Sequence, residues 1–199
     1  MSATAELIKQ LRETTGAGVK DCRDALAAND GDLEKAAAWL REKGLAAASK
    51  KSGRETRNGV LDLYSHGDGR VGVMVEVNCE TDFVGRTREF RTFAHEVALQ
   101  VAAASPRWVR PEDIPADVLK DETRKARDAA LSEGKPEKVV EQIVAGRMEK
   151  FVVESCLLRQ PYIRDESRTL GDMLQEMIAT TGENIAIRRF VRWAVGEEV

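Results

Sequence analysis

The sequence is poor in the residues on which most active sites and metal centres depend. Its 199 residues include two histidines, His66 and His95, and three cysteines, Cys22, Cys79 and Cys156. The cysteines are far apart and form no C-x-x-C pair, so the sequence predicts neither a zinc site nor a disulfide framework. Neither histidine has a nucleophile at a spacing typical of a catalytic pair. We therefore expect no bound metal and no catalysis by histidine or cysteine.

The sequence also lacks the local motifs that bind phosphates or build hydrolytic sites. It contains no G-x-x-x-x-G-K-[ST] loop, no G-x-G-x-x-G after a strand, and no H-E-x-x-H or G-x-S-x-G. The acidic pairs Asp165-Glu166 and Glu197-Glu198 are typical of solvated surface. These absences predict a protein that is not an enzyme and needs no cofactor.

Charge of one sign is not in excess, and no long apolar run is present. With 31 Lys and Arg against 34 Asp and Glu, the formal net charge is -3 and the pI is near 5.6. Because dedicated nucleic-acid binders usually carry a basic excess, we expect no direct nucleic-acid partner. The chain has no apolar segment at its start and no apolar run long enough to cross a membrane, so we expect neither secretion nor membrane insertion. This favours a cytoplasmic protein.

Apolar positions at helical spacing predict three short helices at the start of the chain. Glycine-containing segments at 14–18, 29–31 and 44 are expected to end them. The three helices resemble the ubiquitin-associated fold in layout. Small and then basic residues from 45 to 58 predict a short helix that fades into a linker. We therefore expect an N-terminal module at 1–53 and a separate core at 54–199.

Alternating apolar residues predict a three-stranded antiparallel sheet in that core. One strand begins near Val60, and the turn His66-Gly67-Asp68-Gly69 leads back into a second strand from Val71 to Val77. The segment from Asn184 to Val195 is expected to add the third strand. Its apolar residues share one parity, which Arg189 interrupts; they are Ile185, Ile187, Val191, Trp193 and Val195.

Helical periodicity predicts the remaining elements of the core. A helix starting at Phe83 runs to about Ala102, and two helices, at 116–131 and from Pro136, are expected to form a helical hairpin. Thr169 or Ser167 is expected to cap a last helix. The predicted fold class is thus α+β: a three-helix ubiquitin-associated-like module, then a three-stranded antiparallel sheet packed with helices that include a helical hairpin.

The junction between the second strand and the Phe83 helix allows two interpretations. Phe83 lies seven positions before Phe90, and this helical spacing by itself favours a core residue at the start of the helix. Alternatively, Asp82 and Phe83 form an exposed tip, which presents a charge beside an aromatic wedge to a partner.

Separated motifs resemble the elongation factor Ts family, the bacterial guanine-nucleotide exchange factors for elongation factor Tu. The resemblance covers essentially the whole chain. Its motifs are LIKQLRETTGAGVKDCRDAL from Leu7, GDLEKAAAWLREKG of the third helix, VNCETDFV from Val77, GKPEKVVEQIVAGRMEKF from Gly134, QPYI from Gln160 and GENIAIRRFVRW from Gly182.

The resemblance implies an N-terminal module that docks on the GTPase domain of elongation factor Tu. It also implies a core that inserts its corner of Thr81, Asp82, Phe83 and Val84 near the magnesium and phosphate sites of that GTPase. This interpretation favours the exposed tip. The docking residues implied by the family are Arg12, Val19, Lys20 and His66, with Val19 and Lys20 standing where many members have methionines.

The resemblance further suggests a homodimer. Longer members have a core with two related halves, whereas this chain has the motifs of one half. A second copy related by a two-fold axis would cover a thin sheet with apolar residues on its faces. The alternative is a monomer in which the helices cover the whole sheet.

Two other classes of function remain open at this point. One is an adaptor whose helical module binds ubiquitin-like or nascent-chain partners. The other is a weak RNA-binding protein that uses basic residues at 50–57 together with Arg188, Arg189 and Arg192. Neither accounts for the corner around Phe83.

Overall fold

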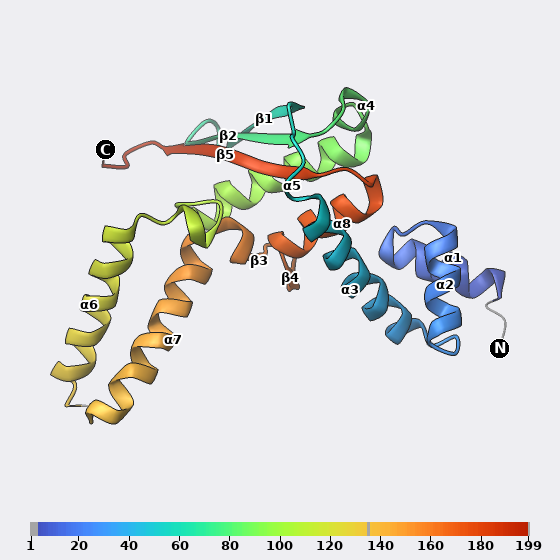
Figure 1. Cartoon of the computed structure of the whole chain (residues 1–199). Helices are drawn as coiled ribbons and strands as arrows, with labels where there is room; N and C mark the ends of the chain where they lie inside the picture. Colours follow the sequence, from blue (N-terminus) through green and yellow to red (C-terminus); the bar gives the residue numbers. More distant parts are fainter. Residues whose placement is uncertain (1–3, 135, 199) are drawn as a thin grey trace. The chain divides into compact units, whose positions relative to one another are not determined.

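The computed structural model describes residues 4–134 and 136–198. Residues 1–3, 135 and 199, which belong to the two expected domains and to the Gly134 motif, lie outside the described residues. The chain divides into two compact units. The first contains residues 1–62, 76–95 and 172–188, and the second contains residues 63–75, 96–171 and 189–199. Figure 1 labels the elements.

The first unit begins with three helices, as the sequence predicts. They are α1 (Ala5–Thr15), α2 (Val19–Ala28) and α3 (Leu33–Lys51). The Thr4 hydroxyl accepts a hydrogen bond from the Leu7 N–H at 3.4 Å and so begins α1, and Gly16 ends it at a φ of +67°. The helices enclose a small core of their own, made of Leu11, Cys22, Ala25, Leu26 and Ala36. Three of these five residues, Cys22, Ala25 and Ala36, have side chains smaller than leucine, which lets short helices pack closely.

The third helix is longer than the sequence suggests. It was expected to end at Gly44, with a separate short helix after it, but α3 continues through Gly44 to Lys51. A glycine inside a helix costs only about 0.5–1 kcal/mol relative to alanine, so it is a weak stop signal where no left-handed turn follows it. The helix therefore extends well into the segment 45–58 that was expected to become a linker (Figure 1).

The three expected strands form one sheet in the order β1-β2-β5. They are β1 (Asn58–His66), β2 (Val71–Cys79) and β5 (Ile185–Ala194). The turn between β1 and β2 has positive φ at Gly67, Asp68 and Gly69, with values of 59°, 55° and 86°. Two glycines and an aspartate are residues that tolerate this left-handed region, which explains how so short a segment reverses the chain.

The face that β5 buries changes along the strand. Ile185 and Ile187 are buried, Arg188 and Arg189 are both exposed, and from there the exposed residues are Val191 and Trp193. At Arg188 and Arg189 two consecutive residues are exposed, so the alternation of more and less buried residues shifts by one position. The shared parity that the sequence predicts is therefore not shared burial, because the apolar residues before Arg189 are buried and those after it are exposed.

Several further elements complete the two units. The second unit holds the short helical turns η1 (Pro111–Asp113) and η2 (Leu157–Arg159) and the antiparallel pair β3 (Pro161–Tyr162) and β4 (Asp165–Thr169), which the sequence did not predict. The helices α5 (Arg88–Ala104) and α8 (Leu170–Thr181) correspond to the expected Phe83 and final helices. The buried face of α5 consists of Phe90, Phe93, Ala94, Val97, Ala98 and Val101.

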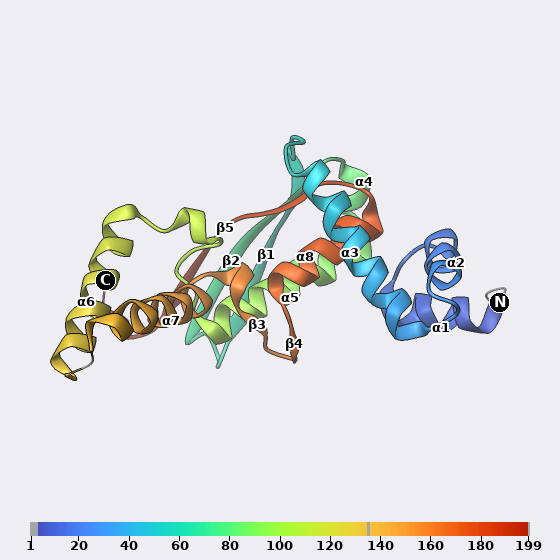
Figure 2. The same cartoon turned by 60° about the horizontal axis from the view of Figure 1, so that its bottom comes forward.

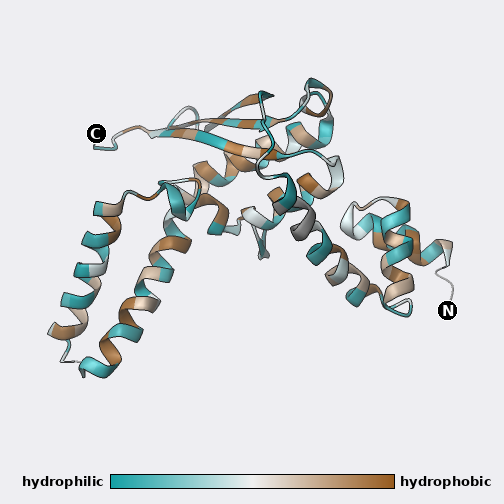
Figure 3. Cartoon of the chain, viewed as in Figure 1, coloured by the Kyte–Doolittle hydropathy of each residue, from teal (hydrophilic) through white to brown (hydrophobic). Residues whose placement is uncertain are grey.

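The expected helical hairpin is present within the second unit. Its helices are α6 (Ala116–Ser132) and α7 (Glu137–Ser155), with Pro136 immediately before the second. They lie side by side in two views (Figures 1 and 2), and hydrophobic and hydrophilic residues alternate along both (Figure 3). Their contact buries Ala126, Ala130, Val140 and Val144. The α+β fold class is thus confirmed.

Two buried glutamines join α5 to the start of the β3–β4 pair. Gln100 is 1% exposed and Gln160 is 4% exposed. The Gln100 amide nitrogen donates to the Gln160 side-chain oxygen at 3.2 Å, and the Gln100 oxygen accepts from the Ile163 N–H at 2.9 Å. Beside them, the Tyr162 hydroxyl donates to Glu96 at 2.6 Å. Because each buried polar group has a partner, these bonds fix the position of residues 160–163.

The Tyr162 hydrogen bond predicts a loss of stability in alkali. Burial, and then the bond to Glu96, raises the pKa of Tyr162 to about 12. Between its ordinary pKa near 10 and this value, only the unfolded chain loses the proton, so the free energy of unfolding falls by about 1.4 kcal/mol per pH unit. Tyr162→Phe should remove this contribution from the slope of stability against pH, measured by urea unfolding from pH 9 to 11.5. Tyr64→Phe, at a half-buried position on β1, should keep it, and equal slopes in the wild type and Tyr162→Phe would contradict the prediction.

Candidate functional site

The corner after β2 is a separate helical turn, α4 (Asp82–Gly85), rather than the start of a long helix. The Thr81 hydroxyl accepts from the Val84 N–H at 3.5 Å and begins this turn. Thr87 then ends it and begins α5, because its hydroxyl donates to the Val84 carbonyl at 2.8 Å and accepts from the Phe90 N–H at 3.2 Å. The prediction of one continuous helix from Phe83 is therefore wrong, since Thr87 starts a new helix in a different direction.

The break between α4 and α5 decides between the two interpretations of Phe83. Phe83 is 80% exposed, whereas Phe90 on α5 is fully buried. Asp82 is exposed beside it and forms an ion pair with Arg86 at 2.9 Å. The spacing of seven residues that favoured a core position carries no weight once the two phenylalanines belong to different helices. The fold thus leaves a large aromatic side chain on its surface next to a carboxylate.

Two glycines allow the backbone to pack tightly under this corner. Gly59 on β1 has a φ of +146°, and a Cβ there would lie 2.1 Å from the Val77 carbonyl oxygen. Gly85 is buried, and a Cβ there would lie 3.4 Å from the Cys79 sulfur. The Cys79 thiol donates to the Thr81 carbonyl at 3.0 Å, and burial raises its pKa. Cys79 is therefore a neutral structural residue that helps to hold the corner.

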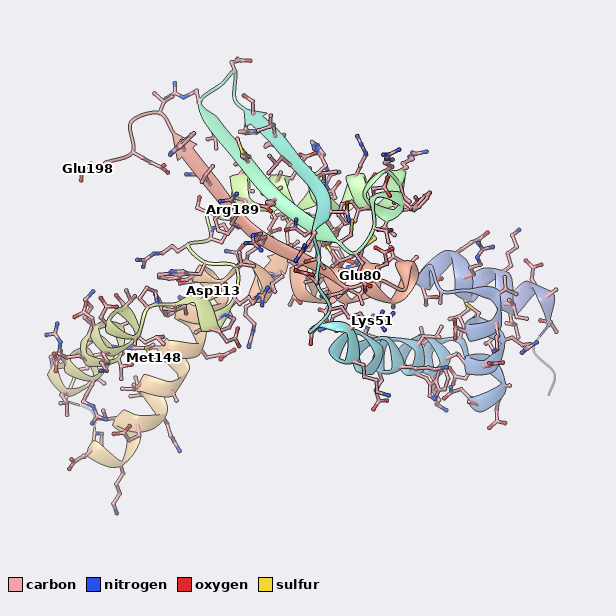
Figure 4. All side chains as sticks on the ribbon, turned by 45° about the horizontal axis from the view of Figure 1, so that its top comes forward. Lys51, Glu80, Asp113, Met148, Arg189 and Glu198 are labelled. Atoms are coloured by element: carbon pink, nitrogen blue, oxygen red, sulfur yellow. The ribbon has the colours of Figure 1, made fainter. Side chains whose placement is uncertain are left out.

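The corner is also tied to the segment between α8 and β5. The Asn184 N–H donates to the Glu80 carboxylate at 2.6 Å, and the buried Asn184 side chain donates to the Arg54 carbonyl at 2.8 Å. The Asn184 N–H, and then the charge of Arg54, hold the pKa of Glu80 below its ordinary value. The charge of Lys51, at the end of α3, also lowers the pKa of Glu80. Figure 4 labels Glu80, at the end of β2, and Lys51.

Glu183 is the residue of this site that the sequence did not single out. Its carboxylate accepts hydrogen bonds from the Glu80 N–H at 3.1 Å, the Thr81 N–H at 3.0 Å and the Thr81 hydroxyl at 2.6 Å. More than a hundred residues separate the partners, so no spacing rule could pair them. The one signal for Glu183 in the sequence was its place in Gly182-Glu183-Asn184, which begins the last motif that resembles the family.

The expected docking residues lie on exposed surface at three places. Arg12 is at the end of α1, and Val19, which is 55% exposed, and Lys20 begin α2. His66 is exposed at the end of β1, where the Tyr64 hydroxyl contacts its Nδ1 at 3.0 Å. Arg12, Val19 and Lys20 thus share one end of the three-helix module, whereas His66 belongs to the other compact unit.

The described residues offer little for bond-making chemistry. No group of three or more His, Cys, Asp or Glu side chains among them is placed to hold a metal ion. Cys22, Cys79 and Cys156 are all buried free thiols, and His95 pairs with Asp62 at 3.1 Å. No helix in residues 4–134 and 136–198 is long and apolar enough to cross a bilayer. What this surface offers instead is a large exposed aromatic side chain, Phe83, on a helical turn that Thr81 caps.

Comparison with known protein families gives two matches. Residues 27–197 match the family described as Elongation factor TS, and residues 2–44 match the UBA-like domain. The first match includes the whole corner and its tether to Glu183. The second match covers most of the three-helix module.

Individual relatives match the chain over almost its full length. Elongation factor Ts of Caldanaerobacter subterraneus subsp. tengcongensis is 55% identical over 196 residues, which cover 98% of each chain. Elongation factor Ts of Moorella thermoacetica is 54% identical over 199 residues, covering 100% of this chain and 98% of that protein. The relative from Carboxydothermus hydrogenoformans is 55% identical over 194 residues, covering 98% of this chain and 89% of its own. The chain belongs to the elongation factor Ts family.

Proposed function

We propose that the corner of Thr81, Asp82, Phe83 and Val84 inserts against the GTPase domain of elongation factor Tu and disturbs its magnesium and phosphate site. As a member of its family, the chain is a nucleotide exchange factor for elongation factor Tu in translation elongation, a cytoplasmic process, and not an enzyme. The observation that carries the residue assignment is the 80% exposure of Phe83 on a capped helical turn. Aromatic anchors of this kind dominate the energy of many protein interfaces.

Exchange of this kind requires no acid, base or nucleophile. GDP and Mg²⁺ are held in a GTPase by charge-assisted contacts whose strength depends closely on geometry, so a wedge that shifts those groups weakens binding. The coupling is reciprocal: if the exchange factor weakens nucleotide binding, nucleotide weakens binding of the factor equally. Incoming GTP can therefore displace the factor, which acts again on another GTPase molecule.

Release of fluorescent GDP from elongation factor Tu tests this function directly. We expect release to accelerate with the concentration of the chain and to saturate as all GTPase becomes bound. An unchanged release rate at micromolar concentrations, with both proteins shown to be folded, would contradict the proposal. The adaptor alternative predicts no effect on any GTPase, and the RNA-binding alternative predicts steeply salt-dependent binding to RNA instead.

We further propose that docking is divided between two modules, with a boundary near Gly53. Arg12, Val19 and Lys20 would supply the contacts of the N-terminal module, and His66 would add a contact from the core. The core that the three helices enclose for themselves supports this division, as does the end of α3 at Lys51. In this scheme residues 1–53 dock and residues 54–199 carry the wedge.

Removal of residues 1–53 should separate docking from exchange. The remaining chain should stay folded, because the sheet, α5 and the helical hairpin lie outside the deleted part. Its exchange activity at low concentration should fall at least about tenfold, since two linked contacts bind far better than one. The check is the concentration dependence of GDP release, alongside circular dichroism. Equal activity of the truncated and full chains would show that the N-terminal module does not dock.

We also propose that two copies of the chain pair through the sheet. The second unit exposes large apolar side chains on and beside its strand segments: Trp193 on β5 is 72% exposed, and Val195, just after β5, is 71% exposed. Leu63 at 68%, Val191 at 41% and Met74 at 39% belong to the same strand segments. An exposed apolar group of this kind is typical of an interface rather than of a free surface. A second copy supplies a covering surface with the same apolar character.

A further inference from the structure

The contacts of Glu183 do more than tie the segment between α8 and β5 to the end of β2, because they also reach Thr81, the residue that begins α4. The Thr81 hydroxyl has one proton, which it donates to Glu183 at 2.6 Å. Its oxygen then accepts from the Val84 N–H at 3.5 Å. One hydroxyl therefore connects the carboxylate of Glu183 to the first turn of α4, which carries Phe83.

The same carboxylate also fixes the backbone that enters the turn. Its second oxygen accepts both the Glu80 N–H and the Thr81 N–H, at 3.1 Å and 3.0 Å. Glu80 in turn accepts the Asn184 N–H at 2.6 Å, so the two segments exchange hydrogen bonds in both directions. Bonds in which one partner is ionised are about twice as strong as neutral ones. The direction in which α4 leaves β2 is thus set by a residue from the other end of the chain.

This tether matters because α4 itself is too short to hold its own orientation. It has four residues, Asp82–Gly85, and isolated helices of this length are unstable. Phe83 is 80% exposed and gains little support from packing. An exposed wedge acts only if it points in the right direction. A loosely held group binds more weakly, because it loses conformational entropy when binding fixes its orientation.

We propose that Glu183 is the positioning residue of the exchange wedge: through the Thr81 hydroxyl and the two amides, it holds α4 in the direction that exchange requires. The inference rests on the proposed role of Phe83. Glu183 does not touch the GTPase in this scheme. Glu183 orders the wedge before the wedge contacts the GTPase, which lowers the entropic cost of that contact. Loss of Glu183 should therefore slow the release of GDP more than it weakens docking.

The first test is made on the free protein and does not depend on elongation factor Tu. Amide hydrogen exchange followed by NMR should show that Glu183→Ala speeds exchange at Glu80, Thr81 and Val84 by about tenfold or more, as local opening becomes easier. Asp165→Ala is the matched control. Asp165 likewise accepts a backbone N–H and a hydroxyl, both from Ser167, at 3.2 Å and 2.6 Å. Unchanged protection of the Thr81 and Val84 amides in Glu183→Ala would overturn the tether.

The second test measures GDP release over a range of factor concentrations. Glu183→Ala should lower the release rate at saturation by about tenfold or more, because a displacement of about 1 Å in a positioned group can cost up to 10²-fold. The half-saturating concentration should change by less than about threefold, since the N-terminal contacts remain. Asp165→Ala should leave both values unchanged. A saturated rate within twofold of the wild type would overturn the positioning role.

A pair of Thr81 variants keeps the proposal testable if Glu183→Ala does not fold. In the free protein, Thr81→Ser retains the hydroxyl and should keep the Val84 amide protected from hydrogen exchange, whereas Thr81→Val, of nearly the same shape, should lose that protection. Equal protection of the Val84 amide in the two variants would overturn the hydroxyl relay. If the wild type itself does not accelerate release, the proposed function fails, while the amide-exchange result still decides whether Glu183 holds the turn.

Discussion

Phe83→Ala should slow GDP release from elongation factor Tu by about thirtyfold or more, while the melting temperature of the chain changes by less than about 2 °C. A buried interface anchor contributes at least about 2 kcal/mol to a complex, which corresponds to that factor. The stability of the free chain should hardly change, because Phe83 is 80% exposed. Stopped-flow release of fluorescent GDP and thermal melts measure the two quantities.

Phe90→Ala and Ile163→Ala are the matched controls for this prediction. Phe90 is fully buried, so its truncation should cost about 3–5 kcal/mol and lower the melting temperature by more than about 6 °C. Ile163 is 42% exposed in the second unit, and its truncation should affect neither quantity. If Phe83→Ala melted like Phe90→Ala, the side chain would be part of the core and the wedge assignment would be lost.

Asp82→Ala should also slow release, with only a small effect on stability. A carboxylate that caps a helix contributes about 1 kcal/mol to stability. In the structure Thr81 caps the turn instead, and Asp82 forms an exposed pair with Arg86. Exposed pairs contribute about 0–1 kcal/mol, so the melting temperature should barely change.

The elements that the sequence predicts well are those fixed by contacts between near neighbours. The three N-terminal helices follow from apolar spacing and from glycine stops such as Gly16, and the β1–β2 turn follows from two glycines that flank Asp68. The helical hairpin likewise follows from stripes of apolar residues on two successive helices. In each case the information lies within a few residues of the structure it determines.

The errors arise where distant or subtle contacts override spacing. Phe83 and Phe90 have core spacing, but the side chain of Thr87 begins a new helix between them. The apolar residues of β5 share a parity, but the pair Arg188 and Arg189 shifts the alternation. The contribution of Glu183 could not be found from spacing, because its partners lie about a hundred residues away. Periodicity assumes an uninterrupted element, and these sites depend on interruptions.

The apolar strand surface predicts a second large effect, on the assembly of the chain. Light scattering behind a sizing column should give a mass of about twice the 22.0 kDa of one chain at micromolar concentrations. Trp193→Asp should raise the dissociation constant at least about thirtyfold, since it removes a large aromatic contact and places an unpaired carboxylate in the interface. Val195, at 71% exposed, offers a second position for the same change.

Leu131→Asp is the matched control for this assembly prediction. Leu131 is 50% exposed on α6, so the variant introduces the same charge at an exposed apolar position away from the strands. It should leave the mass unchanged, and neither variant should lower the melting temperature of the monomer by much, because both side chains are exposed. A wild-type mass near 22.0 kDa across the micromolar range would rule out the dimer.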